Sequence, residues 1–188
     1  MAGDEDEMRQ ALKRVAATLK DAEIPFALSG GYAAWVHGGP EPDHDVDFMA
    51  PPESVPEAVE PLEKAGLRVE QPSEDWLVKV YDGQAMVDLV HRPQGRPVDA
   101  DRLGRAAALA VLSLEMPVLD PTDIIVDKLI VLDEHDCDLG SVLPVLRSLR
   151  EQVDWRRVRA ETRGSPFAEA ALLLAQCLGI APAVGGPA

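Results

Sequence analysis

The 188-residue sequence predicts an α/β fold, a small mixed β-sheet flanked by helices and followed by a helical region. Up to residue 119, short apolar strand-like runs alternate with helical segments and turn residues. From Asp120 onward only helical patterns occur, and the last residues are small or are Gly and Pro. We therefore expect an α/β core over residues 1–119, a helical region over 120–180 and a disordered tail over 181–188.

The elements of the core follow from periodicity. Met8, Leu12, Val15 and Leu19 recur at three- and four-residue spacing, which predicts a first helix over residues 4–22. Further helices are expected over 32–37 and 54–65, and strands over 26–28, 45–49, 67–69, 76–81, 85–91 and near 109–114. An Asp-Gly pair at 82–83 suits the tight turn of a hairpin between the strands 76–81 and 85–91.

The helical region begins with strong start signals. Asp120 can cap a helix, Pro121 suits its first position and Asp123 favours its positive end. Helices are expected over 122–133, 139–152, 155–162 and 166–178.

Charge and composition limit the function classes. With 18 basic and 33 acidic residues the net charge is −15, which argues against broad nonspecific nucleic-acid binding. Arginines nevertheless crowd the C-terminal third, as solvated helix faces or as a local phosphate-binding surface. The acidic N-terminus is unlike a signal peptide, the two cysteines fit no metal or disulfide pattern, and no apolar run reaches the roughly 18 residues of a membrane span. We expect a cytoplasmic protein that does not bind a membrane.

Two aspartates on one strand suggest a metal site. Side chains alternate across a strand, so Asp45 and Asp47 should share a face, where their repulsion calls for a compensating cation. Mg²⁺ prefers such hard oxygen ligands together with substrate phosphates. Asp43-His44-Asp45 has the same spacing, so the pair Asp43 and Asp45 is the alternative; we prefer Asp45 and Asp47 because Phe48 and Met49 continue their strand.

A third carboxylate and a glycine pair fit the same chemistry. Asp88 lies within an apolar strand, where an acid is costly unless it is paired or binds metal. Three carboxylates can hold two metals roughly 3.5–4 Å apart for in-line phosphoryl transfer, and Asp88 can also act as the general base. Gly30 and Gly31 open a helix where backbone N–H groups can approach phosphate, and Ser29 adds a hydroxyl.

These motifs together resemble a known superfamily. Ser29-Gly30-Gly31, thirteen residues, then Asp45-x-Asp47 and a later isolated Asp88 resemble the signature of the DNA polymerase β-like nucleotidyltransferases. The resemblance covers most of residues 24–92. It implies Mg²⁺-dependent transfer of a nucleoside monophosphate from an NTP, with ATP or CTP as expected donors, to an acceptor hydroxyl.

A second segment resembles the small bacterial branch of this superfamily that includes AbiEii-type toxins. Residues 119–124, followed by Lys128-Leu129, look like the segment in which a helical lysine faces the nucleotide phosphates. The resemblance implies that role for Lys128, and a nucleotide-binding role for Asp138 in the acidic element that follows. Ser141 stands where a second acid is common, so Asp136 or Asp133 is an alternative to Asp138.

The acceptor is left open between several classes. We rank first the 3′ acceptor end of tRNA, modified by a toxin of a toxin–antitoxin system with an antitoxin protein as partner, because of the arginine-rich C-terminal third and Lys128. The alternatives are an aminoglycoside- or lincosamide-like antibiotic, a protein hydroxyl that would be AMPylated, and a catalytically inactive nucleotide-binding module. His91 and Arg92, just past Asp88, are candidates to touch a nucleotide.

Overall fold

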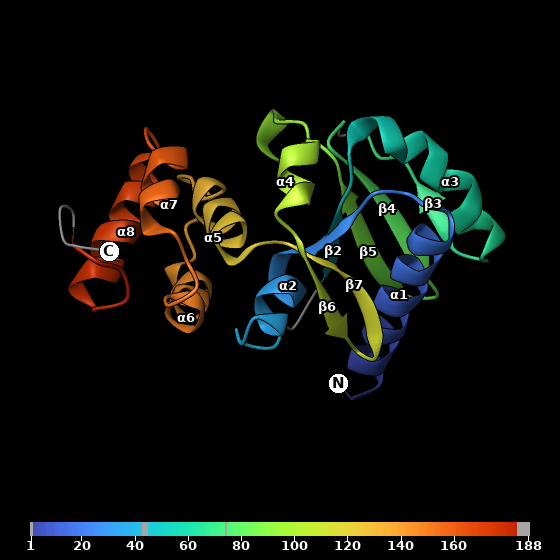
Figure 1. Ribbon diagram of the computed structural model, residues 1–188, viewed down its shortest axis with the longest axis horizontal. Coiled ribbons are helices and arrows are strands. Elements are labelled where there is room, and N and C mark those ends of the chain that lie inside the picture. The colour runs from blue at the N-terminus through green and yellow to red at the C-terminus, as the bar shows by residue number, and fades with distance from the viewer. Residues whose placement is uncertain (1, 43–44, 74, 184–188) are drawn as a thin grey trace. The chain divides into compact units, whose positions relative to one another are not determined.

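The computed structural model describes residues 2–42, 45–73 and 75–183. The chain divides into two compact units, one containing Met1–Ala33 and Glu41–Leu119 and the other Ala34–Pro40 and Asp120–Ala188 (Figure 1). Within the described residues, no helix combines the length and the apolar character that a bilayer crossing requires.

The first unit is built around a seven-stranded mixed sheet in the order β3-β4-β5-β2-β1-β7-β6. Strand β2 pairs in parallel with β5 and β1 with β7, whereas the other neighbours are antiparallel. This confirms the predicted α/β class with a mixed sheet. The strands are β1 (Ala27–Ser29), β2 (Val46–Met49), β3 (Arg68–Glu70), β4 (Leu77–Asp82), β5 (Ala85–Val90), β6 (Ala107–Val111) and β7 (Leu114–Val118).

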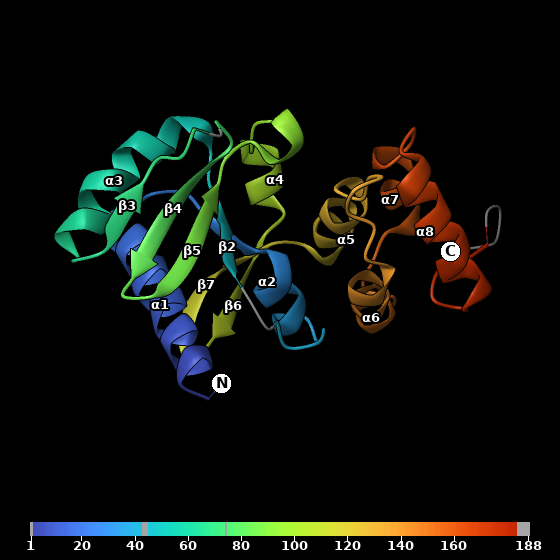
Figure 2. The same ribbon diagram turned by 180° about the vertical axis from the view of Figure 1, so that it is seen from behind.

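Helices α1 (Ala2–Asp21) and α3 (Val55–Lys64) cover one face of this sheet (Figures 1 and 2). The residues on that face are the buried half of the strand alternation, with Val46, Phe48 and Val87 fully buried. Arg14 of α1 ties the layer together: it pairs with Asp82 at the end of β4 and donates a hydrogen bond to the Ala65 carbonyl at 2.7 Å. The apolar core therefore lies between the sheet and these two helices.

The end of the first unit differs from the prediction. We expected one strand near residues 109–114, but the chain forms the hairpin β6–β7 with a two-residue turn at Leu112 and Ser113, both at positive φ. Tight hairpin turns usually place Gly, Asn or Asp at such positions, so the sequence carries no turn signal here. Pro117 inside β7 also argues against a paired strand.

Short helices complete the first unit. The five-residue α4 (Ala100–Gly104), which the sequence analysis did not predict, begins at Asp99, whose carboxylate accepts a hydrogen bond from the Arg102 amide at 2.8 Å. Two 3₁₀ turns lie at η1 (Pro52–Ser54) and η2 (Pro93–Gly95). Helix α2 (Gly30–Val36) starts directly at the end of β1, and its residues from Ala34 on belong to the second unit.

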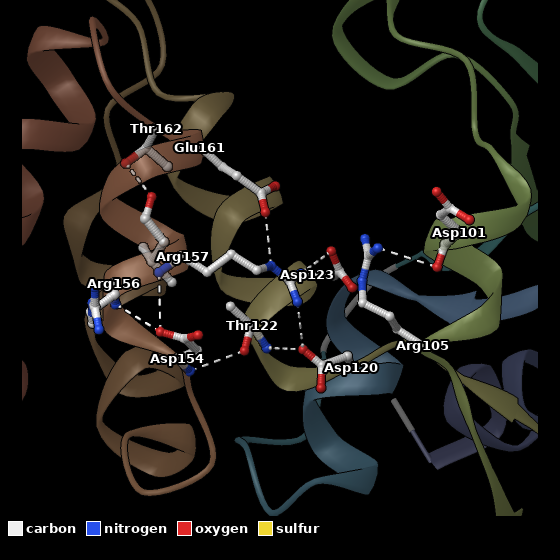
Figure 3. A network of polar contacts seen from close by, with 11 residues as sticks. Asp101, Arg105, Asp120, Thr122, Asp123, Asp154, Arg156, Arg157, Glu161 and Thr162 are labelled. Atoms are coloured by element: carbon white, nitrogen blue, oxygen red, sulfur yellow. Dashed lines mark hydrogen bonds and ion pairs between the residues drawn. The ribbon is translucent and has the colours of Figure 1, made fainter. Parts of the chain in front are cut away.

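The second unit is helical, with α5 (Pro121–Ile130), α6 (Leu139–Leu149), α7 (Trp155–Glu161) and α8 (Pro166–Cys177). Arg157 of α7 pairs with the buried Asp123 near the start of α5, and also lies 3.5 Å from Asp120 and 2.8 Å from Glu161 (Figure 3). Thr122 adds a second link, because its hydroxyl accepts a hydrogen bond from the Asp154 amide at 3.1 Å. Helices α5 and α7 are therefore joined by a polar network as well as by apolar packing.

The start of the predicted disordered tail is held in place. The Ala181 amide donates to the Ala175 carbonyl at 3.2 Å, and the Pro182 carbonyl accepts from Arg159 at 2.6 Å. Residues 184–188 lie outside the described part of the chain.

Candidate active site

Four polar residues lie side by side across the centre of the sheet. The strand register pairs Ser29 of β1 with Asp47 of β2, and Asp47 with Asp88 of β5. Asp88 is in turn paired with Lys79 of β4. Residues paired in register point to the same face of a sheet, so a hydroxyl, two carboxylates and an ammonium form one row.

This row lies on the sheet face that α1 and α3 leave uncovered. The flanking residues of the same strands, such as Phe48, Val80 and Leu89, point the other way and are buried in the core. Figure 2 shows the sheet from the uncovered side, with β4 and β5 in front of α1. On this face Asp47, Asp88 and Lys79 are partly exposed, whereas Ser29 is buried.

The lack of a side chain at Gly30 leaves space for the carboxylate of Asp47. It has φ +61°, in the left-handed region that suits glycine. A Cβ atom at this position would lie 2.8 Å from Asp47 Cγ and 3.1 Å from Asp47 Cβ, well inside van der Waals contact. The glycine thus leaves room for the Asp47 carboxylate directly beside the end of β1. Gly31 meets a different constraint, since its Cβ would lie 2.8 Å from Pro42 Cβ.

Two buried oxygens in the row lack a hydrogen-bond partner. The Ser29 hydroxyl and Asp88 Oδ1 are both shielded from solvent without a partner among the described residues. Burial raises the pKa of the Asp88 carboxyl above its ordinary value, the Lys79 ammonium opposes this shift, and the Asp45 carboxylate reinforces it. Unpartnered buried oxygens are costly, and a bound cation or hydrogen-bonding ligand would satisfy them.

Asp45 does not occupy the strand position predicted for it. Strand β2 begins at Val46, and Asp45 precedes it as an exposed residue with φ +43°. Aspartate tolerates this left-handed conformation better than most residues. Strand alternation therefore does not fix the direction of the Asp45 side chain, although its charge acts on Asp88. The alternative ligand Asp43 lies outside the described residues.

The three predicted carboxylates do not form one cluster among the described residues. In the part of the chain that the structure describes, no three His, Cys, Asp or Glu side chains are grouped so that they could hold a metal ion. What the fold does bring together is Asp47 and Asp88, directly opposite each other on parallel strands, with Ser29 and Gly30 beside them.

The two predicted site residues of the helical region lie in the second unit. Lys128 is half-buried near the end of α5, and its contact with phosphates stays a prediction. Asp138 caps α6, because its Oδ1 accepts hydrogen bonds from the amides of Gly140 at 2.9 Å and Ser141 at 3.3 Å. Its alternative, Asp133, accepts hydrogen bonds from the amides of His135 and Asp136, which lower its pKa. Both carboxylates thus have local structural roles.

His91 and Arg92 follow the end of β5. His91 is buried, its Nδ1 lacks a partner among the described residues, and burial lowers its pKa, as does the charge of Arg92. Arg92 pairs with Asp75 at 2.6 Å. A nucleotide contact by either residue stays a prediction.

Lys79 is the residue of this row that the sequence analysis missed. Its Nζ lies 3.4 Å from the Met86 sulfur and its strand position is opposite Asp88. The signal was present, because the register can be counted back from the two-residue turn at residues 83–84, which puts residue 79 against residue 88.

Comparison with known proteins places the fold. The sequence matches no protein-family model and no curated protein. Among solved structures, the antibiotic-resistance factor ANT(2'')-Ia in solution is similar with a TM-score of 0.63 at 16% identity, covering 90% of this chain and 97% of that one. The lincosamide antibiotic adenylyltransferase LnuA, bound to lincomycin, is similar with a TM-score of 0.52 at 12% identity, covering 72% and 94%.

A third similar structure is an antigenic nucleotidyltransferase-like protein from Paracoccidioides brasiliensis, with a TM-score of 0.54 at 15% identity, covering 92% of this chain and 88% of that one. The chain therefore has the fold of nucleotidyltransferases.

Proposed function

We propose that the chain is a Mg²⁺-dependent nucleotidyltransferase that transfers a nucleoside monophosphate from an NTP to a hydroxyl of a small molecule. The observation that carries this proposal is the juxtaposition of Asp47 and Asp88 on parallel strands, beside Ser29 and Gly30. The nucleotidyltransferase fold supports it independently of the site residues.

The residues present fit Mg²⁺. This ion prefers hard oxygen ligands and is commonly held by one or two carboxylates together with substrate phosphates. Asp47 and Asp88 supply such carboxylates, and Asp88 Oδ1 is buried without a partner in the part of the chain that the structure describes. We assign these two residues as metal ligands. Asp45, the third ligand predicted from the sequence, is not grouped with them in the described part of the chain and stays a prediction. When bound, Mg²⁺ would neutralise charge on the phosphates and lower the pKa of the attacking hydroxyl.

The residues of the row have different roles in the proposed reaction. Ser29 is on the β1 side, where its hydroxyl can donate to a phosphate oxygen and Gly30 presents no side chain to the triphosphate. The acceptor hydroxyl oxygen attacks the α-phosphorus, and the bond from this phosphorus to the bridging oxygen breaks as pyrophosphate leaves. Asp88, which lies directly opposite Asp47, accepts the hydroxyl proton.

A small acceptor is favoured by the extent of the structural similarity. This chain covers 97% of ANT(2'')-Ia, which has been solved in complex with adenylyl-2''-tobramycin, and 94% of LnuA in its lincomycin-bound form. The first is an antibiotic-resistance factor and the second is a lincosamide antibiotic adenylyltransferase. We therefore place a small hydroxylated molecule ahead of the tRNA acceptor end.

The arginines that suggested RNA binding are partly engaged within the protein. Arg157 contacts three carboxylates, Arg150 pairs with Glu151 and Arg159 binds the Pro182 carbonyl. The tRNA acceptor end, an antitoxin partner and the AbiEii-type branch remain predictions from the sequence.

A transfer assay tests the proposal. Each of four α-³²P-labelled NTPs is incubated with Mg²⁺ and either tobramycin, lincomycin, total tRNA or a protein lysate, and the labelled product is identified. We expect label in a small molecule, and loss of transfer in Asp47→Asn and Asp88→Asn. Asp21→Asn, an exposed change at the end of α1, is the matched control that should retain transfer. Label confined to tRNA or protein would refute the small acceptor, and no NTP-dependent product would refute the enzyme.

A further inference from the structure

The acceptor side of the candidate site contains a lysine whose hydrogen-bonding capacity is little used. Lys79 lies on the side of Asp88 away from Asp47, Ser29 and Gly30, since the sheet order runs β4-β5-β2-β1. If the triphosphate lies on the β1 side, as proposed above, the acceptor hydroxyl reaches Asp88 from the β4 side. An acceptor positioned in this way would meet the Lys79 ammonium.

The ammonium is half-buried and has a poor partner. Its hydrogen bond goes to the Met86 thioether at 3.4 Å, and a thioether is a weak acceptor. An ammonium has three donors and is strongly hydrated, so partial burial beside a thioether leaves most of its capacity for a ligand. Asp88 supplies a neighbouring negative charge, but its Oδ1 has no hydrogen-bond partner among the described residues, Lys79 included.

The other cation on this part of the face is already engaged. Arg68 of β3 stacks over the Tyr81 ring, 3.9 Å from its centroid, and pairs with Glu70. Register places Arg68 opposite Tyr81, and Glu70 opposite Lys79, so all four side chains share the face of the row. Among the described residues of β3, β4 and β5, Lys79 is therefore the basic group on this face that is left to contact an acceptor.

We propose that Lys79 is a specificity-determining residue that donates a hydrogen bond to an oxygen beside the reacting hydroxyl of the acceptor. This inference rests on the proposed function and narrows its substrate class. An acceptor with a carboxylate, phosphate or hydroxyl next to the reacting hydroxyl satisfies the ammonium. An acceptor with an ammonium group at that place meets like charge in a partly desolvated site, and is disfavoured.

A series of minimal acceptors tests this selection. Glycerate, glycerol and 3-amino-1,2-propanediol are similar in size and differ mainly in the group beside the hydroxyls. NTP-dependent and Mg²⁺-dependent pyrophosphate release is measured with each, and adducts are confirmed by mass spectrometry. We expect kcat/KM to fall in the order given, with glycerate favoured over the amine by about tenfold or more, the ratio that corresponds to about 1.4 kcal/mol.

Variants assign the selection to Lys79. In Lys79→Met the ratio of glycerate to amine should fall to near one, in Lys79→Glu it should invert, and Lys79→Arg should retain it. Lys64→Met is the control, because Lys64 is an exposed lysine of α3 that pairs with Glu60. Circular dichroism and NTP-induced thermal stabilisation show that each variant is folded and binds nucleotide.

The outcomes separate this inference from the proposed function. If NTP and Mg²⁺ stabilise the wild-type chain, but the ratio is unchanged in Lys79→Glu or no acceptor in the series increases pyrophosphate release, the role of Lys79 is refuted and the nucleotide site stands. If NTP and Mg²⁺ do not stabilise the wild-type chain, the proposed function itself fails, and this inference fails with it.

Discussion

Replacing Gly30 with alanine should disable the candidate site through a single methyl group. The backbone at Gly30 has φ +61°, and an alanine Cβ would lie 2.8 Å from Asp47 Cγ. Carbon atoms in good contact are about 3.5–4.0 Å apart, so the Asp47 carboxylate must retreat by about 0.7 Å or more. Gly30→Ala therefore moves a proposed metal ligand without changing its chemistry.

Two effects of this substitution can be estimated separately. Holding an L-residue in the left-handed conformation costs about 1–2 kcal/mol, which lowers Tm by about 2–8 °C in a chain of this size. Displacement of a reacting group by about 1 Å can reduce the rate about 100-fold, so a shift of this size should reduce kcat by about 10- to 100-fold.

Gly83→Ala is the matched control for the backbone effect. Gly83 lies in the β4–β5 turn with φ +63°, and no atom of the described residues lies within 4 Å of its hypothetical Cβ. Thermal unfolding should show a similar backbone cost in both variants, and NTP turnover with Mg²⁺ should fall only in Gly30→Ala. Equal loss of stability with full turnover in Gly30→Ala would show that the reaction does not depend on the Asp47 carboxylate at its position beside Gly30.

Three further results are expected. Asp88→Asn should be more stable than the wild type near neutral pH without Mg²⁺, because the raised pKa of Asp88 means that its ionised form destabilises the folded chain above the folded-state pKa. Urea unfolding should show that this difference in the free energy of unfolding vanishes as the pH falls below 3.8, the ordinary pKa of an aspartate. Arg157→Met should lower the free energy of unfolding by about 1.5–3 kcal/mol, since it removes a charged hydrogen bond to the buried Asp123 carboxylate, and a double-mutant cycle with Asp123→Asn should show coupling between the two residues. The lowered pKa of His91 means that protonation favours the unfolded chain, so the free energy of unfolding should fall as the pH drops below about 6.5. His91→Phe should lose less of this free energy than the wild type between about pH 7.5 and 5.5, and equal pH slopes for the two proteins would contradict this.

The sequence predicted the elements that carry strong local signals. The helix start at Asp120 and Pro121 and the hairpin around Gly83 follow from cap and turn chemistry, which acts over a few residues. The β6–β7 hairpin was not predicted, because Leu112 and Ser113 adopt positive φ although neither is a residue type that favours it. In that turn, pairing of the two strands outweighs the local preference.

The candidate site was predictable in its residues more than in its geometry. Strand alternation gave Asp47 its face, but the left-handed backbone of Asp45 is a local exception that alternation cannot anticipate. The pairing of Asp47 with Asp88 depends on which strands become neighbours, and this is decided by packing of the whole sheet. Asp138 shows what local chemistry adds, because an acid just before a helix caps it, a role that the sequence analysis did not assign to this residue.

The parallel pairing of β2 with β5 has a consequence for the order of folding. The β4–β5 hairpin joins segments separated by two residues, whereas β2 and β5 are separated by α3, β3 and β4. Closing the longer loop costs more chain entropy, so hairpin contacts can form well before Asp47 and Asp88 become neighbours. Ligand affinity would then emerge only after β2 and β5 have paired, which makes nucleotide binding during refolding a kinetic probe of this pairing step.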